Sequence, residues 1–254
     1  GFADMVNRRN FAYDDCGHGT HICGIIGGSG RMSGGRYSGI APGCNLIMVK
    51  VLDRKGNGYS SDVLAGISWV LERKEQLGIR ILNISVGACS KRGMSENSAL
   101  VKGVNRAWDA GLVVVVAAGN NGPRTMSITT PGISRKVITV GCSDDDREVL
   151  VGGNRMVDYS GRGPTAACIC KPDLVAPGCS VVSCSSRADK YTIKSGTSMS
   201  TPIVSGAVAL LLERFPDMSN KDVKLRLRES SVDIGLPRNQ QGWGLLDVGK
   251  MLER

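Results

Sequence analysis

Ser198 stands where a hydroxyl could act as a nucleophile. It lies in the small-residue stretch 195–202, and the almost wholly apolar residues 203–212 predict a buried helix that begins beside it. A helix N-terminus gathers unpaired N–H groups and the positive end of the helix dipole, so an oxyanion formed at Ser198 would be stabilised there. A serine before a helix can also be only an N-cap, and this stretch alone leaves both interpretations open.

Two imidazoles accompany this hydroxyl in the whole chain. His18 and His21 both belong to the glycine-bracketed motif Gly-His-Gly-Thr-His at 17–21. Apolar residues at positions 22, 25 and 26 have helical spacing, which places His18 where a loop becomes a short helix. If the protein uses an imidazole for acid–base work near neutral pH, one of these two must supply it.

Asn120 is a third residue that could take part in such chemistry. It follows the continuous apolar run 112–118, which is typical of a parallel strand covered on both faces. Ligands bind at the carboxyl ends of the strands in open α/β sheets, so the Asn120 carboxamide could donate to an oxyanion. The alternative is an ordinary turn asparagine.

The elements that must position these residues alternate between strand and helix. Strands are predicted near 44–52, 79–85, 112–118 and 137–141, and helices near 62–77, 95–110, 198–212 and 219–229. This order predicts an α/β fold, a doubly wound and mostly parallel sheet with helices on both faces. We expect one domain over residues 1–254. Residues 1–17 show no convincing strand, 144–146 indicate a solvated turn, and 171–178 indicate an extended connection.

Composition narrows the class of protein. The net charge is +9, but the basic residues form scattered pairs such as Arg8-Arg9 without aromatic residues between them, so we expect no nucleic-acid partner. No apolar run reaches the roughly 18 residues that a membrane-spanning helix needs, so we expect no membrane partner. The nine cysteines, an odd number, often stand where Ala or Val would serve. They predict free buried thiols and a cytoplasmic location, with secretion as the alternative.

Three motifs together resemble the subtilisin-like serine proteases, the subtilases. They are Gly-His-Gly-Thr-His at 17–21, Ala-Ala-Gly-Asn at 117–120 and Gly-Thr-Ser-Met at 196–199, in the family's order and roughly its spacing. The resemblance implies a three-layer subtilisin-like fold and an endopeptidase that cuts extended or unfolded polypeptides. It makes Ser198 the nucleophile, His18 the general base, Asn120 the oxyanion donor and His21 a structural residue.

The same resemblance implies a substrate pocket and bears on cofactors. The walls of the pocket for the residue before the scissile bond would be Ser85, Val86 and Gly87 on one side and Ala117, Ala118 and Gly119 on the other, where strand edges pair with an extended substrate. Calcium is common among subtilases, but the loop after His18 has few oxygen donors. We therefore expect no cofactor and assign no metal, with calcium left as the open alternative.

The resemblance leaves one catalytic role unfilled. The family's triad aspartate ends an early strand well before the histidine, yet only 17 residues precede His18 here. Asp14 and Asp15 are too near in sequence, Asp4 follows no apolar strand, and Asp53 and Asp173 fall on other family segments. We expect the protein's own N-terminal segment, about 30–50 residues long, to supply that strand and its carboxylate.

Two alternatives remain open. Because the triad aspartate is not in the chain, the protein could be a non-catalytic subtilase-fold protein that binds or regulates. Cys23, one turn beyond His18, could serve as a regulatory thiol near the imidazole, or it could be a buried filler on the apolar face of the helix.

Overall fold

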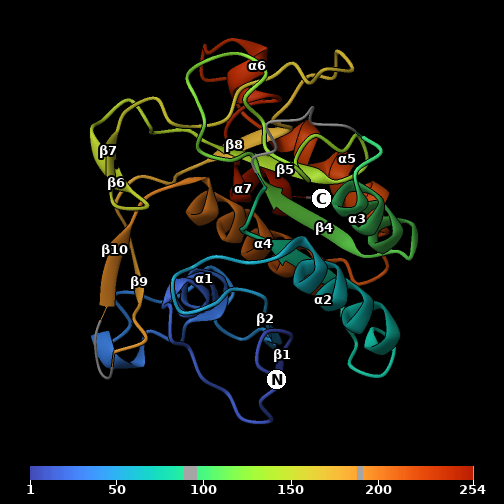
Figure 1. The fold of residues 1–254 in the computed structure, drawn as a ribbon. Coiled ribbons are helices and arrows are strands. Elements are labelled where there is room, and N and C mark those ends of the chain that lie inside the picture. The colour runs from blue at the N-terminus through green and yellow to red at the C-terminus, as the bar shows by residue number, and fades with distance from the viewer. Residues whose placement is uncertain (89–95, 188–190, 254) are drawn as a thin grey trace.

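The centre of the molecule is a four-stranded parallel sheet. The computed structural model describes residues 1–88, 96–187 and 191–253. The strand order is β3-β4-β5-β8, with bounds Ile81–Ile84, Val113–Ala117, Ile138–Cys142 and Leu174–Ala176 (Figure 1). Every residue of β4 and β5 is buried, as expected for continuous apolar runs in a parallel sheet.

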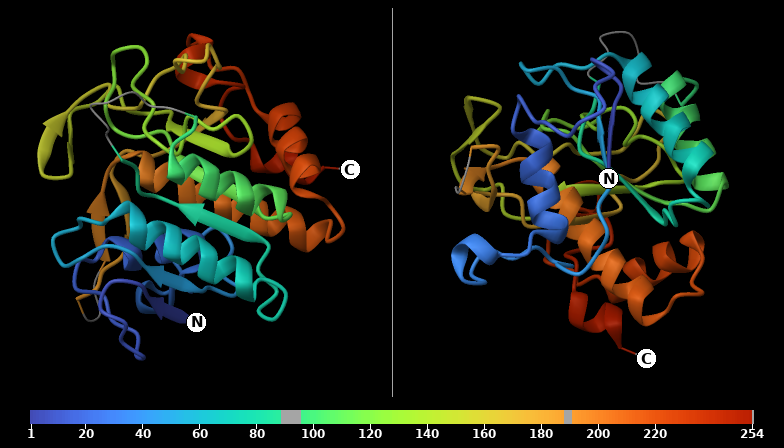
Figure 2. Two further views of the ribbon diagram at one scale, coloured as in Figure 1. Left: turned by 45° about the vertical axis from the view of Figure 1, so that its right-hand side comes forward. Right: turned by 90° about the horizontal axis from the view of Figure 1, so that it is seen from below.

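Helices cover both faces of this sheet. Helices α2 (Ser60–Arg73) and α3 (Ala99–Asp109) pack together on one face, and α4 (Thr197–Arg214) crosses the other face against β3, β4 and β5 (Figure 2). The predicted three-layer, doubly wound α/β architecture is therefore confirmed. The predicted start of α3 near residue 95 falls at the edge of the undescribed segment 89–95, and the helix itself begins after Ser98, whose side chain caps it.

The remaining elements surround this core. Helix α1 (His18–Gly27) packs on α4, and the antiparallel hairpins β6–β7 and β9–β10 lie side by side at one end of the molecule (Figures 1 and 2). The bounds of these and the other elements are β1 Phe2–Asp4, β2 Met48–Lys50, β6 Val149–Val151, β7 Asn154–Met156, β9 Val181–Cys184, β10 Tyr191–Lys194, η1 Arg31–Ser33, α5 Asn220–Ser230, α6 Arg238–Gln241 and α7 Val248–Leu252.

Two segments that were expected not to form strands do form them. β1 pairs in parallel with β2, so the expectation of no strand in residues 1–17 was wrong. Its three residues are too few to show a period, and only the partner strand defines it. β8 pairs with β5, so part of the expected connection 171–178 is the fourth strand of the sheet. Its prolines, at 172 and 177, lie outside the paired residues 174–176.

The predicted solvated turn at 144–146 is also wrong. Asp145 is only 4% exposed and accepts a 2.7 Å hydrogen bond from the Ser160 N–H. Asp144 accepts the N–H groups of Gly178 and Cys179 at 2.8 and 3.1 Å. Both carboxylates therefore anchor neighbouring loops, a role that three adjacent acidic residues do not reveal in the sequence.

The parallel strands fall into two groups. β1 and β2 form a sheet of their own, and β3 pairs with β4 on one side. Within the described residues no ladder joins β2 to β3, although both strands line one cavity. The facing edges of these two strands are therefore open to that cavity.

Candidate active site

Ser198 lies in the first turn of α4, between two buried residues. The helix is capped by Gly196, whose φ of 141° favours glycine, and no side chain completes that cap. Ser198 is therefore not the N-cap, and its Oγ instead donates a 2.9 Å hydrogen bond to the carbonyl oxygen of Ser85. Its neighbours Thr197 and Met199 are buried while Ser198 itself is half-buried, so the hydroxyl is both fixed and reachable.

His18 is the first residue of α1 and reaches the same carbonyl oxygen. Its Nε2 lies 3.2 Å from the Ser85 oxygen, 67 residues away in the chain. A carbonyl oxygen only accepts hydrogen bonds, so this contact requires the proton on Nε2. Burial lowers the pKa of the imidazole below its usual 6.5, against the opposing effect of the Ser85 hydrogen bond. The nucleophile and base of the sequence prediction therefore converge on one main-chain oxygen.

The turn before His18 is held by Asp14. Its carboxylate accepts hydrogen bonds from the N–H groups of Cys16, Gly17 and Thr20 and from the Thr20 hydroxyl, at 2.6 to 3.0 Å. Burial alone would raise the pKa of Asp14, but these hydrogen bonds outweigh it and lower the pKa to about 2. Asp14 thus stays ionised and stabilises the free N–H groups at the start of α1.

His21 is separated from this chemistry. Its ring is fully buried, and Nε2 lies 3.1 and 3.2 Å from the carbonyl oxygens of Val181 and Thr192 in the β9–β10 hairpin. Burial lowers the pKa of His21 to about 4, so the ring is neutral at neutral pH. Of the two histidines, only His18 shares a hydrogen-bond partner with Ser198.

Asn120 sits beside the start of α4, as its place after β4 predicted. Its Oδ1 accepts 3.0 Å hydrogen bonds from both the N–H and the hydroxyl of Thr197. The same hydroxyl accepts from the Gly119 N–H at 3.1 Å. These donors identify the carboxamide oxygen, which leaves Nδ2, on the Gly196 side, as the group that can donate to a ligand.

The six predicted pocket residues lie on two neighbouring strand ends, after β3 and at the end of β4. They differ in how much they can offer a substrate. Gly87 is exposed and Val86 is half-buried, whereas Ala117 and Ala118 are buried. The Ala118 N–H and C=O are bonded to Val140 and Thr129, so Ala118 has no edge left for a peptide.

Thr129 is a residue of this region that the sequence did not single out. Atoms of its side chain lie within 2.5 Å of where a Cβ would stand on Gly87 and on Gly119. The Thr129 side chain therefore fills the space between the two predicted walls. Small residues at 87 and 119 are required by this close approach, and a pocket between them is short.

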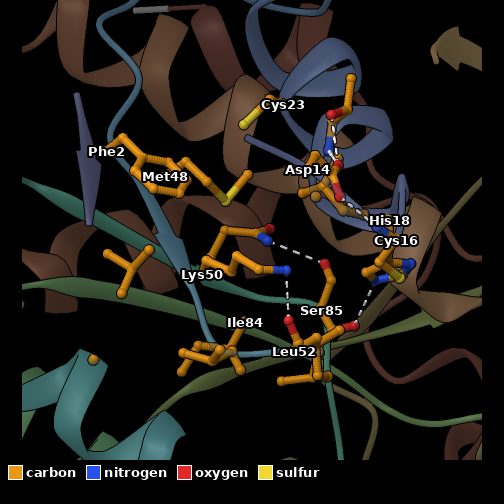
Figure 3. Close-up of a pocket in the computed structure, with 18 of the residues that line it drawn as sticks. Phe2, Asp14, Cys16, His18, Cys23, Met48, Lys50, Leu52, Ile84 and Ser85 are labelled. Atoms are coloured by element: carbon orange, nitrogen blue, oxygen red, sulfur yellow. Dashed lines mark hydrogen bonds between the residues drawn. The ribbon is translucent and has the colours of Figure 1, made fainter. Parts of the chain in front are cut away.

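A cavity of about 490 Å³ opens beside His18. It is lined by both open strand edges, β2 and β3, by α2, and by residues of α1 and the loop before it. Figure 3 shows Asp14, His18 and Cys23 along one side, with Leu52, Ile84 and Ser85 opposite. Apart from Asp14, His18 and Lys50, these labelled residues give the cavity a largely apolar lining.

No described carboxylate contacts the His18 ring. Asp4 ends β1, contrary to the expectation that it follows no strand, but it accepts the N–H groups of Val6, Asn7 and Arg9 and the Tyr13 hydroxyl. Asp15 pairs with Lys50 at 2.6 Å. Asp14 is engaged as described above.

The described residues offer no cluster of metal ligands, and their cysteines are unpaired. In residues 1–88, 96–187 and 191–253, no group of three or more His, Cys, Asp or Glu side chains could hold a metal ion. The eight cysteines of these segments are free thiols, and Cys89 lies outside the described residues. Of these eight, only Cys142 is buried, whereas Cys168 and Cys170 are exposed and the others are half-buried, so the expectation of buried thiols was wrong for most of them. Burial raises the pKa of Cys23 to about 11, which favours the unreactive thiol and supports the filler interpretation over the regulatory one.

Comparison with known proteins places these features in a family. The family model described as the subtilase family matches residues 3–244. Serine protease AprX of Bacillus subtilis (strain 168) is 42% identical over 248 residues, which cover 91% of this chain and 56% of that protein. Subtilisin DY of Bacillus licheniformis is 33% identical over 250 residues, covering 98% of this chain and 82% of that protein.

A solved structure supports the same family, and one relative bears on cellular location. The structure of sphericase matches with a TM-score of 0.80 and 31% identity, covering 96% of this chain and 83% of that chain. The minor extracellular protease Epr of Bacillus subtilis (strain 168) is 32% identical over 235 residues, covering 92% of this chain and 32% of that protein. The cytoplasmic expectation thus finds no support here, whereas secretion is consistent with the relatives. Among the described residues, no helix is long and apolar enough to cross a membrane.

Proposed function

The chain belongs to the subtilase family of serine peptidases, and from this we propose that it is an endopeptidase that hydrolyses peptide bonds in extended or unfolded polypeptides. Ser198 is the nucleophile, His18 the general base and Asn120 the oxyanion donor. The observation that carries the proposal is the convergence of Ser198 Oγ and His18 Nε2 on the Ser85 carbonyl oxygen. Because both contacts are to one oxygen, the Ser198 hydroxyl must turn from Ser85 towards His18 before its proton can pass to the ring.

The proposed reaction follows the geometry. Ser198 Oγ attacks the substrate carbonyl carbon while its proton passes to His18 Nε2, and the carbonyl oxygen becomes an oxyanion. Asn120 Nδ2 donates to that oxyanion, and the N-terminus of α4 adds its dipole. His18 then returns the proton to the leaving amine as the C–N bond breaks. Water repeats the sequence on the acyl-enzyme and regenerates Ser198.

The tautomer of His18 makes a further group necessary. The contact with Ser85 keeps the proton on Nε2, whereas a general base needs Nε2 unprotonated and the proton on Nδ1. A carboxylate that accepts from Nδ1 would fix this tautomer and stabilise the imidazolium. Loss of that tautomer in related triads reduces the rate by about 10⁴.

We propose that this carboxylate arrives on an additional parallel strand between β2 and β3, supplied by the protein's own chain before Gly1. Two features support this proposal: the two open strand edges and the apolar cavity between them. A strand there would pair with both edges and bury its side chains against α1 and α2. Its carboxyl end would lie near Ser85 and His18, because the carboxyl ends of parallel strands share one edge of a sheet.

Labelling with a fluorophosphonate tests the peptidase function. The full-length protein should be labelled, and Ser198→Ala should abolish the label. The competing function, a non-catalytic protein that binds or regulates, is favoured by the lack of a described carboxylate on His18. Failure of the correctly folded full-length protein to label would overturn the peptidase and favour that alternative.

The additional strand has its own test. We expect the sequence immediately before Gly1 in the full protein to be an apolar strand that ends in Asp-x-Gly, and the intact mass of the active sample to include it. A single active species of 26.9 kDa, the mass of these 254 residues alone, would contradict the strand proposal.

A further inference from the structure

Gly17, the residue before the proposed base, is held from both sides by opposite charges. Its N–H donates a 2.7 Å hydrogen bond to Asp14 Oδ1, and its carbonyl oxygen accepts a 3.1 Å hydrogen bond from Lys194 Nζ. The backbone of Gly17 has φ of 77°, and a Cβ would come within 2.8 Å of Ser186 Oγ, so glycine is required there. The peptide groups on either side of Gly17 are therefore fixed where α1 begins.

Lys194 connects this turn to the strand that leads to the nucleophile. It is the last residue of β10, three residues before α4 begins at Thr197, and it is 177 residues from Gly17 in the chain. One side chain thus joins the base-bearing turn and the nucleophile-bearing segment. Asp14 alone could not make this connection, because its bonds to Cys16, Gly17 and Thr20 stay within one turn.

We propose that Lys194 is a positioning residue of this site, because its hydrogen bond to the Gly17 carbonyl oxygen joins the turn before His18 to the strand that leads into α4. The inference rests on the proposed peptidase function. It assigns a role in the reaction to a residue that none of the three sequence motifs contains. This hydrogen bond, called the tie below, keeps His18 and Ser198 at a fixed relative position. The positive charge of Lys194 lowers the pKa of His18, so the base stays neutral to lower pH.

The electrostatic part follows from the groups that face His18. Burial lowers the pKa of the imidazole most, and the charge of Lys194 lowers it further, whereas Asp14 acts in the opposite direction. His21 lies one turn further along α1. Lys50 lines the same cavity, but its charge is paired with Asp15. Among the described residues, Lys194 is therefore a cation whose removal should raise the pKa of His18.

The experiment uses the full-length protein and three substitutions at one position. Lys194→Met removes both the tie and the charge, Lys194→Gln keeps a donor for the Gly17 carbonyl without the charge, and Lys194→Arg keeps both. Lys102→Met, at an exposed lysine of α3, is the control for loss of one surface charge. NMR follows the imidazole titrations, and His18→Gln identifies the one that belongs to His18.

The expected results separate the two parts of the proposal. In Lys194→Met and Lys194→Gln the His18 midpoint should rise by roughly half a unit to one unit, and in Lys194→Arg and Lys102→Met it should stay at the wild-type value. The midpoint of fluorophosphonate labelling against pH should move with it. At high pH, Lys194→Met should label about tenfold more slowly than wild type, and Lys194→Gln should recover most of that rate because it restores the tie.

Three outcomes decide against the proposal or against its premise. An unchanged His18 midpoint in both neutral variants overturns the electrostatic role. Equal labelling rates at high pH in Lys194→Met and wild type overturn the tie. If the wild-type protein never labels but the NMR midpoint still moves as expected, the peptidase function fails while the link between Lys194 and the imidazole stands.

Discussion

The hydroxyl of Ser198 donates a 2.9 Å hydrogen bond to the main-chain carbonyl of Ser85, 113 residues away. His18 Nε2 contacts the same oxygen. The Ser85 side chain is fixed in turn by Asn83, whose amide donates to Ser85 Oγ at 3.0 Å and accepts from Ser205 of α4 at 2.8 Å. This carbonyl is the meeting point of the site, and the first step requires the Ser198 proton to leave it for His18.

The rate of that step should depend on the neutral form of His18. Burial moves the pKa of His18 down, whereas the carboxylate proposed on Nδ1 would move it up. We expect the fluorophosphonate labelling rate to be constant at high pH and to fall through a single midpoint as His18 is protonated. Stopped labelling reactions between pH 4 and 8 measure this fall, and a rate that does not change over that range would contradict the assignment.

Asn120 should contribute through its Nδ2 donor more than through its anchored oxygen. Asn120→Ala loses both, whereas Asn120→Asp keeps an oxygen that can accept from Thr197. We expect both variants to lower kcat by about 10²–10³ with little change in KM, the effect of removing one oxyanion donor. Thr197→Val, which keeps the Asn120 carboxamide, is the matched control and should be milder. Retention of kcat within threefold in Asn120→Asp would disprove the role.

Thr129 should set the size of the residue accepted before the scissile bond. Its side chain fills the space between Gly87 and Gly119, so Thr129→Gly should lengthen the proposed pocket. The ratio of kcat/KM for peptides with Phe and with Ala at that position should rise by about tenfold or more. Thr129→Ala should lie between, and Thr125→Gly, at an exposed position, should leave the ratio unchanged. An unchanged ratio in Thr129→Gly would place the pocket elsewhere.

His21 should make the fold sensitive to acid. Its pKa is about 4 in the folded state against 6.5 when exposed, so between these values the unfolded state binds more protons. Its contribution to stability is complete above pH 6.5 and is lost as the pH falls towards 4, by about 3 kcal/mol. Urea unfolding at pH 7 and pH 4.5 measures this loss. In His21→Gln the loss should be smaller by that amount, and an equal loss in both proteins would be the contrary result.

Removing Asp173 from its buried ion pair with Lys171 should destabilise the fold more than removing Lys171. Lys171 Nζ lies 2.5 Å from Asp173 Oδ2, and the same carboxylate accepts from the Thr139 N–H at 2.7 Å and faces Lys224 at 3.5 Å. Asp173→Asn strands a buried cation and should cost about 3–5 kcal/mol. Lys171→Met should cost less, because Asp173 keeps the other two partners.

Unfolding in urea at pH 7 ranks these two variants. Asp217→Asn, at an exposed position of the chain, controls for the loss of one carboxylate. Burial lowers the pKa of Lys171 to about 8, so the stranded amine in Asp173→Asn can release its proton, which limits the cost. A greater loss of stability in Lys171→Met than in Asp173→Asn would contradict the expected order.

Much of the fold and part of the site were predictable because their signals are local. Five consecutive apolar residues predict the strand at 113–117, and an apolar run after a turn of small residues predicts α4. Ser198 and His18 were found because only two histidines exist and each lies in a short motif. β1 was missed because three residues carry no period, and Asp145 was misread because an acidic turn looks the same whether exposed or buried.

The sequence by itself determined the chemical inventory of this protein: one serine at a helix start, one histidine motif and one asparagine after a buried strand, all in the order of one family. Tertiary structure alone decided how they meet. The Ser85 carbonyl, Thr129 and Lys194 act through partners 67, 113 or 177 residues away, or through close backbone approach. Main-chain atoms and packing distances have no residue code, so only the folded chain reveals which oxygen holds the base and which charge stands beside it.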